Sequence, residues 1–199
     1  MEELRSARRF LKKICPEIVI DDLNFSVLNE HTAFSEQTGM LAPVLDGKDM
    51  VLLSEAGLPC VADPGSSLVA LAHEHGIRVI PLSGPSSLYL ALMASGMNGQ
   101  NFAFNGYLPV DHRERSQRIK QLESDSRSKN QTQIFIETPY RNNQLLQAIL
   151  QACKPDTRLC VAVDLTLQGE WVKSQSVDKW KKGNIPDLNK RPAVFLIGQ

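Results

Sequence analysis

Apolar positions along the chain recur at spacings that predict both helices and strands. The first predicted helix has apolar residues at helical intervals and basic residues on its other faces: Leu4, Ala7, Leu11 and Ile14 form the apolar side. Residues 50–54 and 77–82 are short continuous apolar runs, as expected of parallel strands covered on both faces. The first half of the chain therefore predicts two strands, each followed by a helix.

Capping residues indicate where those helices begin and end. Ser66 is the expected N-cap of the first and Gly76 the residue just past its end. The second helix, near residues 88–95, is apolar almost all round and ends at Gly96, so it is expected to be buried. A strand–helix–strand–helix order indicates a parallel sheet.

The second half of the chain predicts a mixed α+β arrangement. Residues 97–110 are rich in Gly, Asn and Pro and are expected to form a linker. A charged helix is predicted near 112–123, an exposed loop at 124–131, and a helix over 140–152 with Thr138 as its N-cap and Pro139 in its first turn. Strands are expected at 134–136, 159–165, 171–176 and 193–197, and the close sequence spacing of the middle pair favours antiparallel pairing.

Composition narrows the class of protein. The 199 residues are 42% hydrophobic and 22% charged with a formal net charge of zero, which argues against a strongly basic nucleic-acid binder but leaves local basic patches possible. No apolar run is long enough to cross a bilayer, and the N-terminus does not resemble a signal peptide. The four cysteines and four histidines are scattered, so we expect no metal site and a reducing cytoplasmic location.

Candidate chemistry lies in three turns that follow apolar strands, at residues 54–59, 83–87 and 137–141. Ligands of open α/β sheets bind outside the carboxyl ends of the strands. Neither a Walker lysine motif nor G-x-G-x-x-G is present, so glycines, hydroxyls and nearby carboxylates favour a neutral or cationic ligand. Each of three candidates could instead have a purely structural role. Ser86 could cap a helix, Asp63 could form an Asx turn, and Glu137 could form a salt bridge with Arg141.

Five sequence motifs, in order, resemble the ribosomal RNA small-subunit methyltransferase I family of the tetrapyrrole-methylase superfamily. They are Ser54-Glu55-Ala56-Gly57-Leu58-Pro59 with Ala62-Asp63-Pro64-Gly65, then Pro81 to Ser87 with Ala94-Ser95-Gly96, then Phe104 to Pro109, then Phe135 to Arg141, and finally Leu165-Thr166 with Gly169-Glu170. The chain departs from the family pattern at Glu55 and Leu58, where the family has Asp and Thr. Relative to that pattern, the family's first strand and glycine-rich loop are missing ahead of Met1, and a small C-terminal extension is absent.

The resemblance implies a tetrapyrrole-methylase fold of two α/β domains, a parallel-sheet domain at 1–100 and a mixed-sheet domain at 101–199, with S-adenosylmethionine in a cleft between them. It implies a homodimer as well. The cofactor-binding residues it implies are Ser54, Glu55, Ala56, Gly57, Pro59, Ser86, Ser87, Leu165, Thr166 and Leu196. Glu137 and Arg141 would face the substrate.

The implied reaction is methyl transfer to a ribose 2′-hydroxyl of ribosomal RNA. The cofactor supplies the electrophile, so the protein positions the reactants and assists loss of the hydroxyl proton. Glu137 or Glu170 would polarise the substrate, and Arg141 would hold a phosphate. Basic stretches at 5–13, 113–120 and 173–191 could track an RNA backbone. The alternatives are a methylase of a corrin-like or other small substrate and a non-catalytic remnant of the cofactor cleft.

Overall fold

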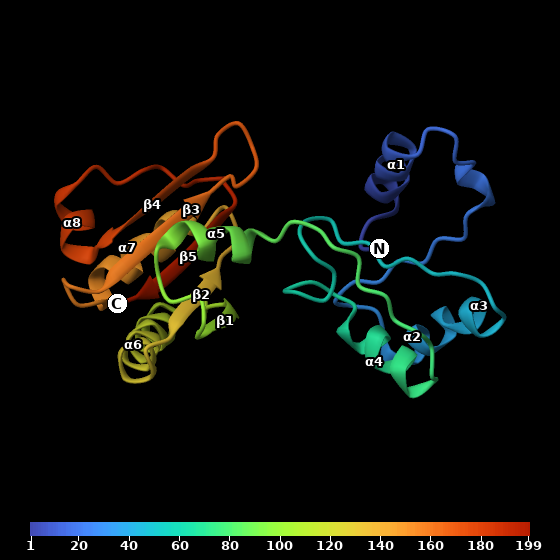
Figure 1. Ribbon diagram of the computed structural model, residues 1–199, viewed down its shortest axis with the longest axis horizontal. Helices are drawn as coiled ribbons and strands as arrows, with labels where there is room; N and C mark the ends of the chain where they lie inside the picture. Colours follow the sequence, from blue (N-terminus) through green and yellow to red (C-terminus); the bar gives the residue numbers. More distant parts are fainter. The chain divides into compact units, whose positions relative to one another are not determined.

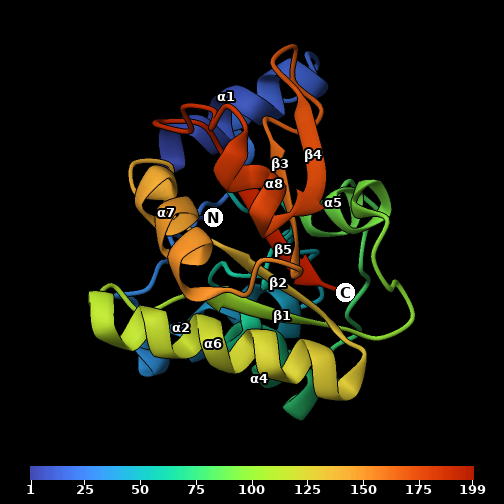
Figure 2. The same ribbon diagram turned by 90° about the vertical axis from the view of Figure 1, so that its left-hand side faces the viewer.

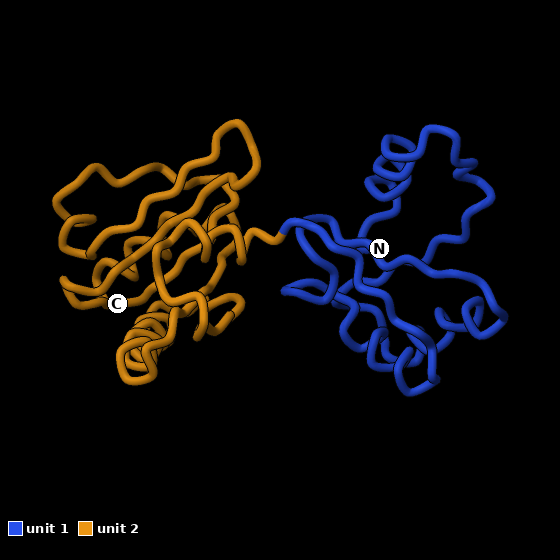
Figure 3. Tube along the Cα trace, in the orientation of Figure 1, with its two compact units in different colours: residues 1–85 blue, residues 86–199 orange.

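The computed structural model describes residues 1–199, which form two compact units, residues 1–85 and residues 86–199 (Figure 3). Each unit is described by itself. Figure 1 labels the elements of both.

The first unit contains helices and turns around a small apolar core. Its helices are α1 (Leu4–Ile14), α2 (Phe34–Met40), α3 (Ala42–Leu45) and α4 (Ser66–Glu74), with a short 3-10 turn at Ile20–Asp22. The core is formed by five buried aliphatic residues, namely Leu28, Leu41, Leu68, Leu71 and Ala72. Helix α1 has the bounds that its apolar spacing predicts, and α4 ends as predicted, with Gly76 at a φ of +68°. The predicted N-cap of α4 is wrong by one residue, because Gly65 takes that position.

The two strands predicted for this unit do not form. Residues 50–54 and 77–82 carry no strand pairing, and the exposed fractions of Val51, Ile80 and Leu82 are 63%, 60% and 77%. An isolated apolar run cannot satisfy its backbone hydrogen bonds as a strand without a neighbour. Neither run pairs with the other or with a third segment here, so the predicted parallel sheet of the first half is absent from this structure.

The second unit is built on one five-stranded sheet with the order β1-β2-β5-β3-β4. Its strands are β1 (Phe102–Tyr107), β2 (Thr132–Ile136), β3 (Arg158–Val163), β4 (Trp171–Ser176) and β5 (Ala193–Gly198). The β1–β2 pair is parallel, whereas β5 runs antiparallel to β2 and β3, and β4 antiparallel to β3. The prediction of a mixed sheet with an antiparallel middle pair is confirmed.

Helices cover both faces of this sheet (Figure 2). Helices α6 (His112–Lys129), α7 (Asn142–Ala152) and α8 (Val177–Lys182) pack on one face over alternate strand residues, and α5 (Ser87–Ser95) packs on the other. On the first face, the rings of Phe135 and Phe195 stack at 6.1 Å, and the fully buried Trp180 donates its indole N–H to the Leu159 carbonyl at 2.9 Å.

Several element predictions in this unit are wrong in informative ways. The expected linker over 97–110 contains β1, an edge strand whose register shifts where Gly106 takes a φ of +61°. The expected loop at 124–131 is mostly the last turns of α6, closed by Asn130 in the left-handed region. Helix α5 is only half buried: Ala91 and Leu92 face the sheet, and Tyr89 and Met93 are exposed.

Candidate functional site

The turn at residues 54–59 is held by polar contacts with its own unit. Ser54 donates to the Asp63 carboxylate at 2.5 Å and accepts from the Ala56 N–H at 3.2 Å. The Glu55 carboxylate accepts the Ser6 hydroxyl at 2.5 Å, and the Glu55 N–H donates to Glu2 at 3.2 Å. The turn is therefore fastened to the start of α1.

Backbone conformation explains why this loop needs glycine. Gly57 has a φ of +84° with open space where a Cβ would lie, so its conformation alone disfavours a side chain. Gly65 has a φ of +131°, and a Cβ there would lie 2.6 Å from the Leu52 side chain. Cys60 and Ala62 also take positive φ values of 69° and 62°, which are uncommon for residues with a Cβ. The clustering of such residues marks a loop whose shape is imposed by its surroundings.

Ser86 and Ser87 stand at the start of α5. Ser86 is the N-cap residue, with extended φ and ψ, but its hydroxyl makes no capping hydrogen bond. The capping role considered from the sequence is therefore filled only by its backbone carbonyl, which accepts from the Leu90 N–H. The hydroxyl of Ser86 and the first N–H groups of α5 remain available to a ligand.

Glu137 and Arg141 meet at the carboxyl end of β2. One oxygen of the Glu137 carboxylate accepts from the Thr138 N–H and from Arg141 Nη2, both at 2.7 Å. Glu137 is 5% exposed, and its second oxygen, Oε2, is buried with no hydrogen-bond partner. The salt bridge considered from the sequence is present, yet it uses only half of the carboxylate's hydrogen-bonding capacity.

Arg141 forms the N-cap of α7 in place of the predicted Thr138. Its Nε atom is buried without a partner. The next residue, Asn142, is fully buried, and it donates to the Arg191 carbonyl at 2.6 Å while its own carbonyl oxygen is unpaired. Three buried polar atoms in this short segment thus lack partners, and such groups are uncommon in native proteins.

Leu165 and Thr166 follow the carboxyl end of β3 in a tight loop. The Thr166 N–H donates to Glu170 Oε2 at 2.7 Å, and Asp164 and Thr166 take positive φ values of 49° and 69°. Arg191 closes the other side by donating to the Asp164 carboxylate at 2.7 Å and to the Gly169 carbonyl at 2.8 Å. The role that this structure gives to Glu170 is therefore to hold its own loop.

The remaining candidate, Leu196, is fully buried in β5 within the apolar cluster beneath α5. Its side chain belongs to the core of the second unit. The structure thus brings Glu137 together with Arg141 and Thr166 together with Glu170. Because β5 separates β2 from β3 and runs opposite to both, these two pairs lie at one end of the sheet.

The sequence analysis missed the Asp164–Arg191 pair and Asn142 at this same end. Asp164 lies inside the strand predicted over 159–165, whereas β3 ends at Val163, so the rule that selected turns after strands did not reach it. Arg191 and Asn142 gave no signal, because their positions depend on how the loop before β5 meets the start of α7.

Neither a metal cluster nor a membrane span is apparent in residues 1–199. No three His, Cys, Asp or Glu side chains gather as ligands for a metal ion. No helix combines the length and apolar character needed to cross a bilayer.

The chain is similar in sequence to a known protein family. Residues 3–179 match the family described as Tetrapyrrole (Corrin/Porphyrin) Methylases. The chain is 37% identical over 138 residues to the ribosomal RNA small subunit methyltransferase I of Mesorhizobium japonicum, a match covering 69% of this chain and 46% of that protein. It is 32% identical over 170 residues to the protein of the same name from Vibrio cholerae, covering 85% and 58%. The chain thus spans about half the length of these curated relatives.

Solved structures share the fold. The methyltransferase CobJ matches with a TM-score of 0.62 at 17% identity, over 96% of this chain and 80% of that one. A conserved hypothetical protein of Aeropyrum pernix, APE0931, matches with a TM-score of 0.52 at 18% identity, over 72% and 55%.

Proposed function

The chain belongs to the tetrapyrrole (corrin/porphyrin) methylase family, and from this premise we propose that it transfers a methyl group from S-adenosylmethionine to RNA of the small ribosomal subunit. The observation that carries the proposal is the similarity to relatives named ribosomal RNA small subunit methyltransferase I, at 37% and 32% identity. The proposed acceptor is a ribose 2′-hydroxyl.

The residues of each unit suit parts of the cofactor. S-adenosylmethionine carries an ammonium, a carboxylate, a ribose and a sulfonium, so it needs hydroxyls, backbone groups and negative charge around it. The unused hydroxyl of Ser86 and the free N–H groups at the start of α5 suit its polar edges. The Glu55 side chain and the open backbone at Gly57 are the corresponding groups of the 54–59 turn. Bound cofactor would supply the methyl group as an electrophile.

Glu137 and Arg141 are the proposed catalytic pair. A 2′-hydroxyl is a poor nucleophile, and a carboxylate that takes up its proton as the methyl group transfers would assist it. The unpartnered Oε2 of Glu137 supports that role, because the ion pair with Arg141 and the Thr138 N–H use only Oε1. Arg141 would orient the carboxylate and hold an adjacent phosphate. We assign Glu170 a supporting role, since it fixes the Thr166 backbone.

The proposal includes a homodimer acting in the cytoplasm, as the family resemblance implies. Light scattering after size exclusion would then give twice the mass of the chain.

A methyl-transfer assay tests the function. Purified chain is incubated with tritiated S-adenosylmethionine and unmodified small-subunit ribosomal RNA, both free and assembled into subunits. We expect label in RNA, located to a ribose by its resistance to alkaline cleavage at the modified position. A 2′-deoxy substitution at the labelled nucleotide should abolish transfer. Label on a base, or labelling that survives the 2′-deoxy substitution, would contradict the assigned acceptor.

A further inference from the structure

Helix α6 covers one face of the sheet in the second unit and has two different solvent-facing sides (Figure 2). Its buried side is formed by Arg115, Ile119, Leu122, Glu123 and Ser126. On one side of this strip, the solvent-facing cations are held by a hydrogen bond or an ion pair to their neighbours. On the other side the solvent-facing residues are basic.

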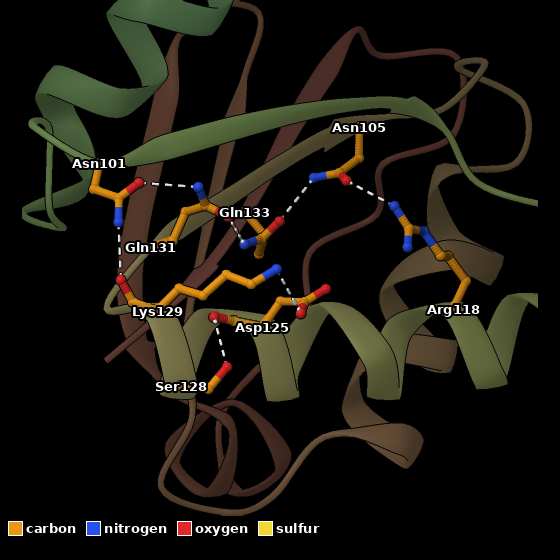
Figure 4. A network of polar contacts seen from close by, with 8 residues as sticks. All are labelled: Asn101, Asn105, Arg118, Asp125, Ser128, Lys129, Gln131 and Gln133. Atoms are coloured by element: carbon orange, nitrogen blue, oxygen red, sulfur yellow. Dashed lines mark hydrogen bonds and ion pairs between the residues drawn. The ribbon is translucent and has the colours of Figure 1, made fainter.

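The first of these sides belongs to a polar network along the edge of the sheet (Figure 4). Lys129 pairs with Asp125 at 2.9 Å, and Arg118 donates to the Asn105 side chain at 2.9 Å. From Asn105 a chain of amide hydrogen bonds continues through Gln133 and Gln131 to Asn101. These contacts fix α6 against β1 and β2 and use up the cations on that side.

The basic side is a line of three cations at seven-residue intervals: Arg113, Lys120 and Arg127. Seven residues are nearly two helical turns, so the three lie on one line about 10 Å apart. Gln117, Ser124 and Ser128 fall beside this line, and so does Glu123, whose side chain is buried. Arg113 and Lys120 are exposed and form no ion pair.

The line ends in an open groove of about 620 Å³ between the last turns of α6 and the end of α7. Lys120, Ser124, Arg127, Ser128 and Lys154 line it, together with Glu123. The Glu123 carboxylate is buried and accepts hydrogen bonds from the Lys154 N–H and the Thr157 hydroxyl. Arg127 donates to Asp156 and to the Thr157 hydroxyl through one nitrogen, Nη2. The groove therefore offers an anion two ammonium groups without ion pairs and the Ser124 hydroxyl, whereas the Ser128 hydroxyl donates to the Asp125 carbonyl at 3.5 Å.

The direction of the line follows from the topology. Strands β1 and β2 are parallel, and α6 begins at His112, soon after β1 ends at Tyr107. The start of α6 thus lies toward the sheet end that holds Glu137, and the helix runs back to the opposite end. The fourteen residues from Arg113 to Arg127 cover about 21 Å. The cations therefore lead away from the proposed catalytic pair.

We propose that this basic line, Arg113, Lys120 and Arg127 with Lys154, binds the phosphate backbone of the substrate RNA beyond the nucleotide that is methylated. This inference rests on the proposed function, because it assigns the substrate a docking surface. A chain with zero net charge has no general attraction for nucleic acid, so the unpaired Arg113, Lys120 and Lys154 supply it locally, beside an Arg127 that is already paired with Asp156. Regularly spaced cations and hydroxyls match a polyanion, and phosphate contacts of this kind set position without reading sequence.

The test compares two triple variants of the full chain by fluorescence anisotropy with a labelled single-stranded RNA of about 20 nucleotides, titrated at several salt concentrations. The docking variant is Arg113→Gln, Lys120→Gln, Lys154→Gln. Its matched control, Lys48→Gln, Arg78→Gln, Arg158→Gln, removes equal charge from exposed positions outside the line that likewise form no ion pair. Each phosphate contact contributes about 0.7 to the slope of log affinity against log salt.

We expect the docking variant to lose about tenfold or more in RNA affinity and about two in the magnitude of that slope, with the control near wild type. Equal behaviour of the two variants would overturn the docking surface, and so would binding of wild type to phosphatidylglycerol vesicles but not to RNA. Methyl transfer is measured in parallel at saturating RNA. If wild type transfers methyl groups to RNA while the variants bind alike, the inference fails and the proposed function stands. If wild type binds RNA through the line but transfers nothing, the proposed function fails and the surface stands.

Discussion

Glu137 is a buried carboxylate with one oxygen committed and one free. Its Oε1 has two donors at 2.7 Å, and its Oε2 has none. A purely structural ion pair would gain from satisfying both oxygens, because an unsatisfied buried acceptor costs about 1–3 kcal/mol. An unsatisfied buried acceptor of this kind is uncommon in native proteins and marks Glu137 as a candidate functional group.

Replacing Glu137 by Gln should therefore reduce methyl transfer by about 100-fold or more, since a positioned general base contributes roughly that much. We expect the variant to keep its affinity for S-adenosylmethionine. Rates with tritiated cofactor and RNA measure this. A variant that is less stable to urea but has an unchanged kcat would show that Glu137 only pairs with Arg141.

The four cysteines should differ sharply in reactivity. Burial raises the pKa of Cys153 and of Cys160 to about 12, so about one thiol in ten thousand is ionised at pH 8. The pKa of Cys15 is raised chiefly by its hydrogen bond to the Glu17 carboxylate, and that of Cys60 chiefly by burial, but both are partly exposed. Mass spectrometry after iodoacetamide at pH 8 should find Cys15 and Cys60 labelled in the folded chain, and the other two only in denaturant.

A second variant tests the cause of the Cys15 shift. Glu17→Gln removes the carboxylate that stabilises the neutral thiol, so the pKa of Cys15 should fall and its labelling should accelerate several-fold. The rate at Cys60 serves as the internal control. An unchanged Cys15 rate would mean that the hydrogen bond to Glu17 does not persist in solution.

At the scale of single residues, the sequence predicted which residues to examine but not which contacts they make. The turn rule selected Glu137 and Arg141 and the family resemblance implied Thr166, and all three lie at one end of the sheet. The sequence could not foresee that Glu170 is bound to the Thr166 backbone, because that contact depends on loop closure. Nor could it foresee the unused hydroxyl of Ser86, since Ser at a helix start ordinarily caps the helix.

Among the elements, α6 is the one that differs most from its prediction and on which the docking surface depends. Its polar C-terminal half looks like a loop in sequence, but Ser126 is buried and Asp125 pairs with Lys129 one turn later. Tertiary contacts and local pairs thus extend a helix beyond its apolar pattern. Strand β1 was missed for the converse reason, because a bulged edge strand with Asn and Gly does not show strand composition.

The N-terminus of α6 gives a pH-dependent test. The Asp111 side chain accepts from the Arg113 and Glu114 N–H groups at 2.9 and 3.0 Å, and the bond from Glu114 is the main cause that lowers the pKa of Asp111 below 3.8. Because the pKa of Asp111 is lower in the folded chain than in the unfolded chain, the ionised carboxylate stabilises the helix at pH values above the unfolded pKa. That stabilisation is lost as the pH falls through the folded pKa. The protection factor of the first-turn amides of α6, which is their exchange rate relative to the intrinsic rate at the same pH, should therefore fall below about pH 4.

Asp111→Asn is the matched variant. Asn can still cap the helix but does not titrate, so its first-turn protection should be independent of pH between 5 and 3. A loss of protection at low pH in Asp111→Asn equal to that in wild type would show that another group is responsible.

In the whole molecule, the two units differ in the size of their cores. The second unit buries residues on both faces of its sheet, whereas the first has one cluster of five buried aliphatic residues and no strands. Local stability follows buried apolar contact and hydrogen-bonded backbone. Amides of β2, β3 and β5 should therefore exchange much more slowly than those of α4 when the chain is followed by hydrogen exchange and mass spectrometry. Equal protection of residues 68–72 and 193–198 would contradict this.

The prediction of a parallel sheet in the first unit is wrong, and the reason lies at the scale of the whole molecule. Sequence pattern identifies segments that can be strands, and residues 50–54 and 77–82 are such segments. Whether they become strands depends on a hydrogen-bonding neighbour, which no local pattern specifies. The family motifs remain in these loops even though the strands do not form here.

The central claim is that this chain is built to use S-adenosylmethionine, and isothermal titration calorimetry tests it most directly. Titrating S-adenosylmethionine and S-adenosylhomocysteine into the folded 199-residue chain should give micromolar binding with one site per chain. Ser86→Ala should weaken it several-fold, as expected for loss of one hydrogen bond. Ser124→Ala, outside the proposed cofactor residues, should leave it unchanged. A folded chain that binds neither compound would contradict the account.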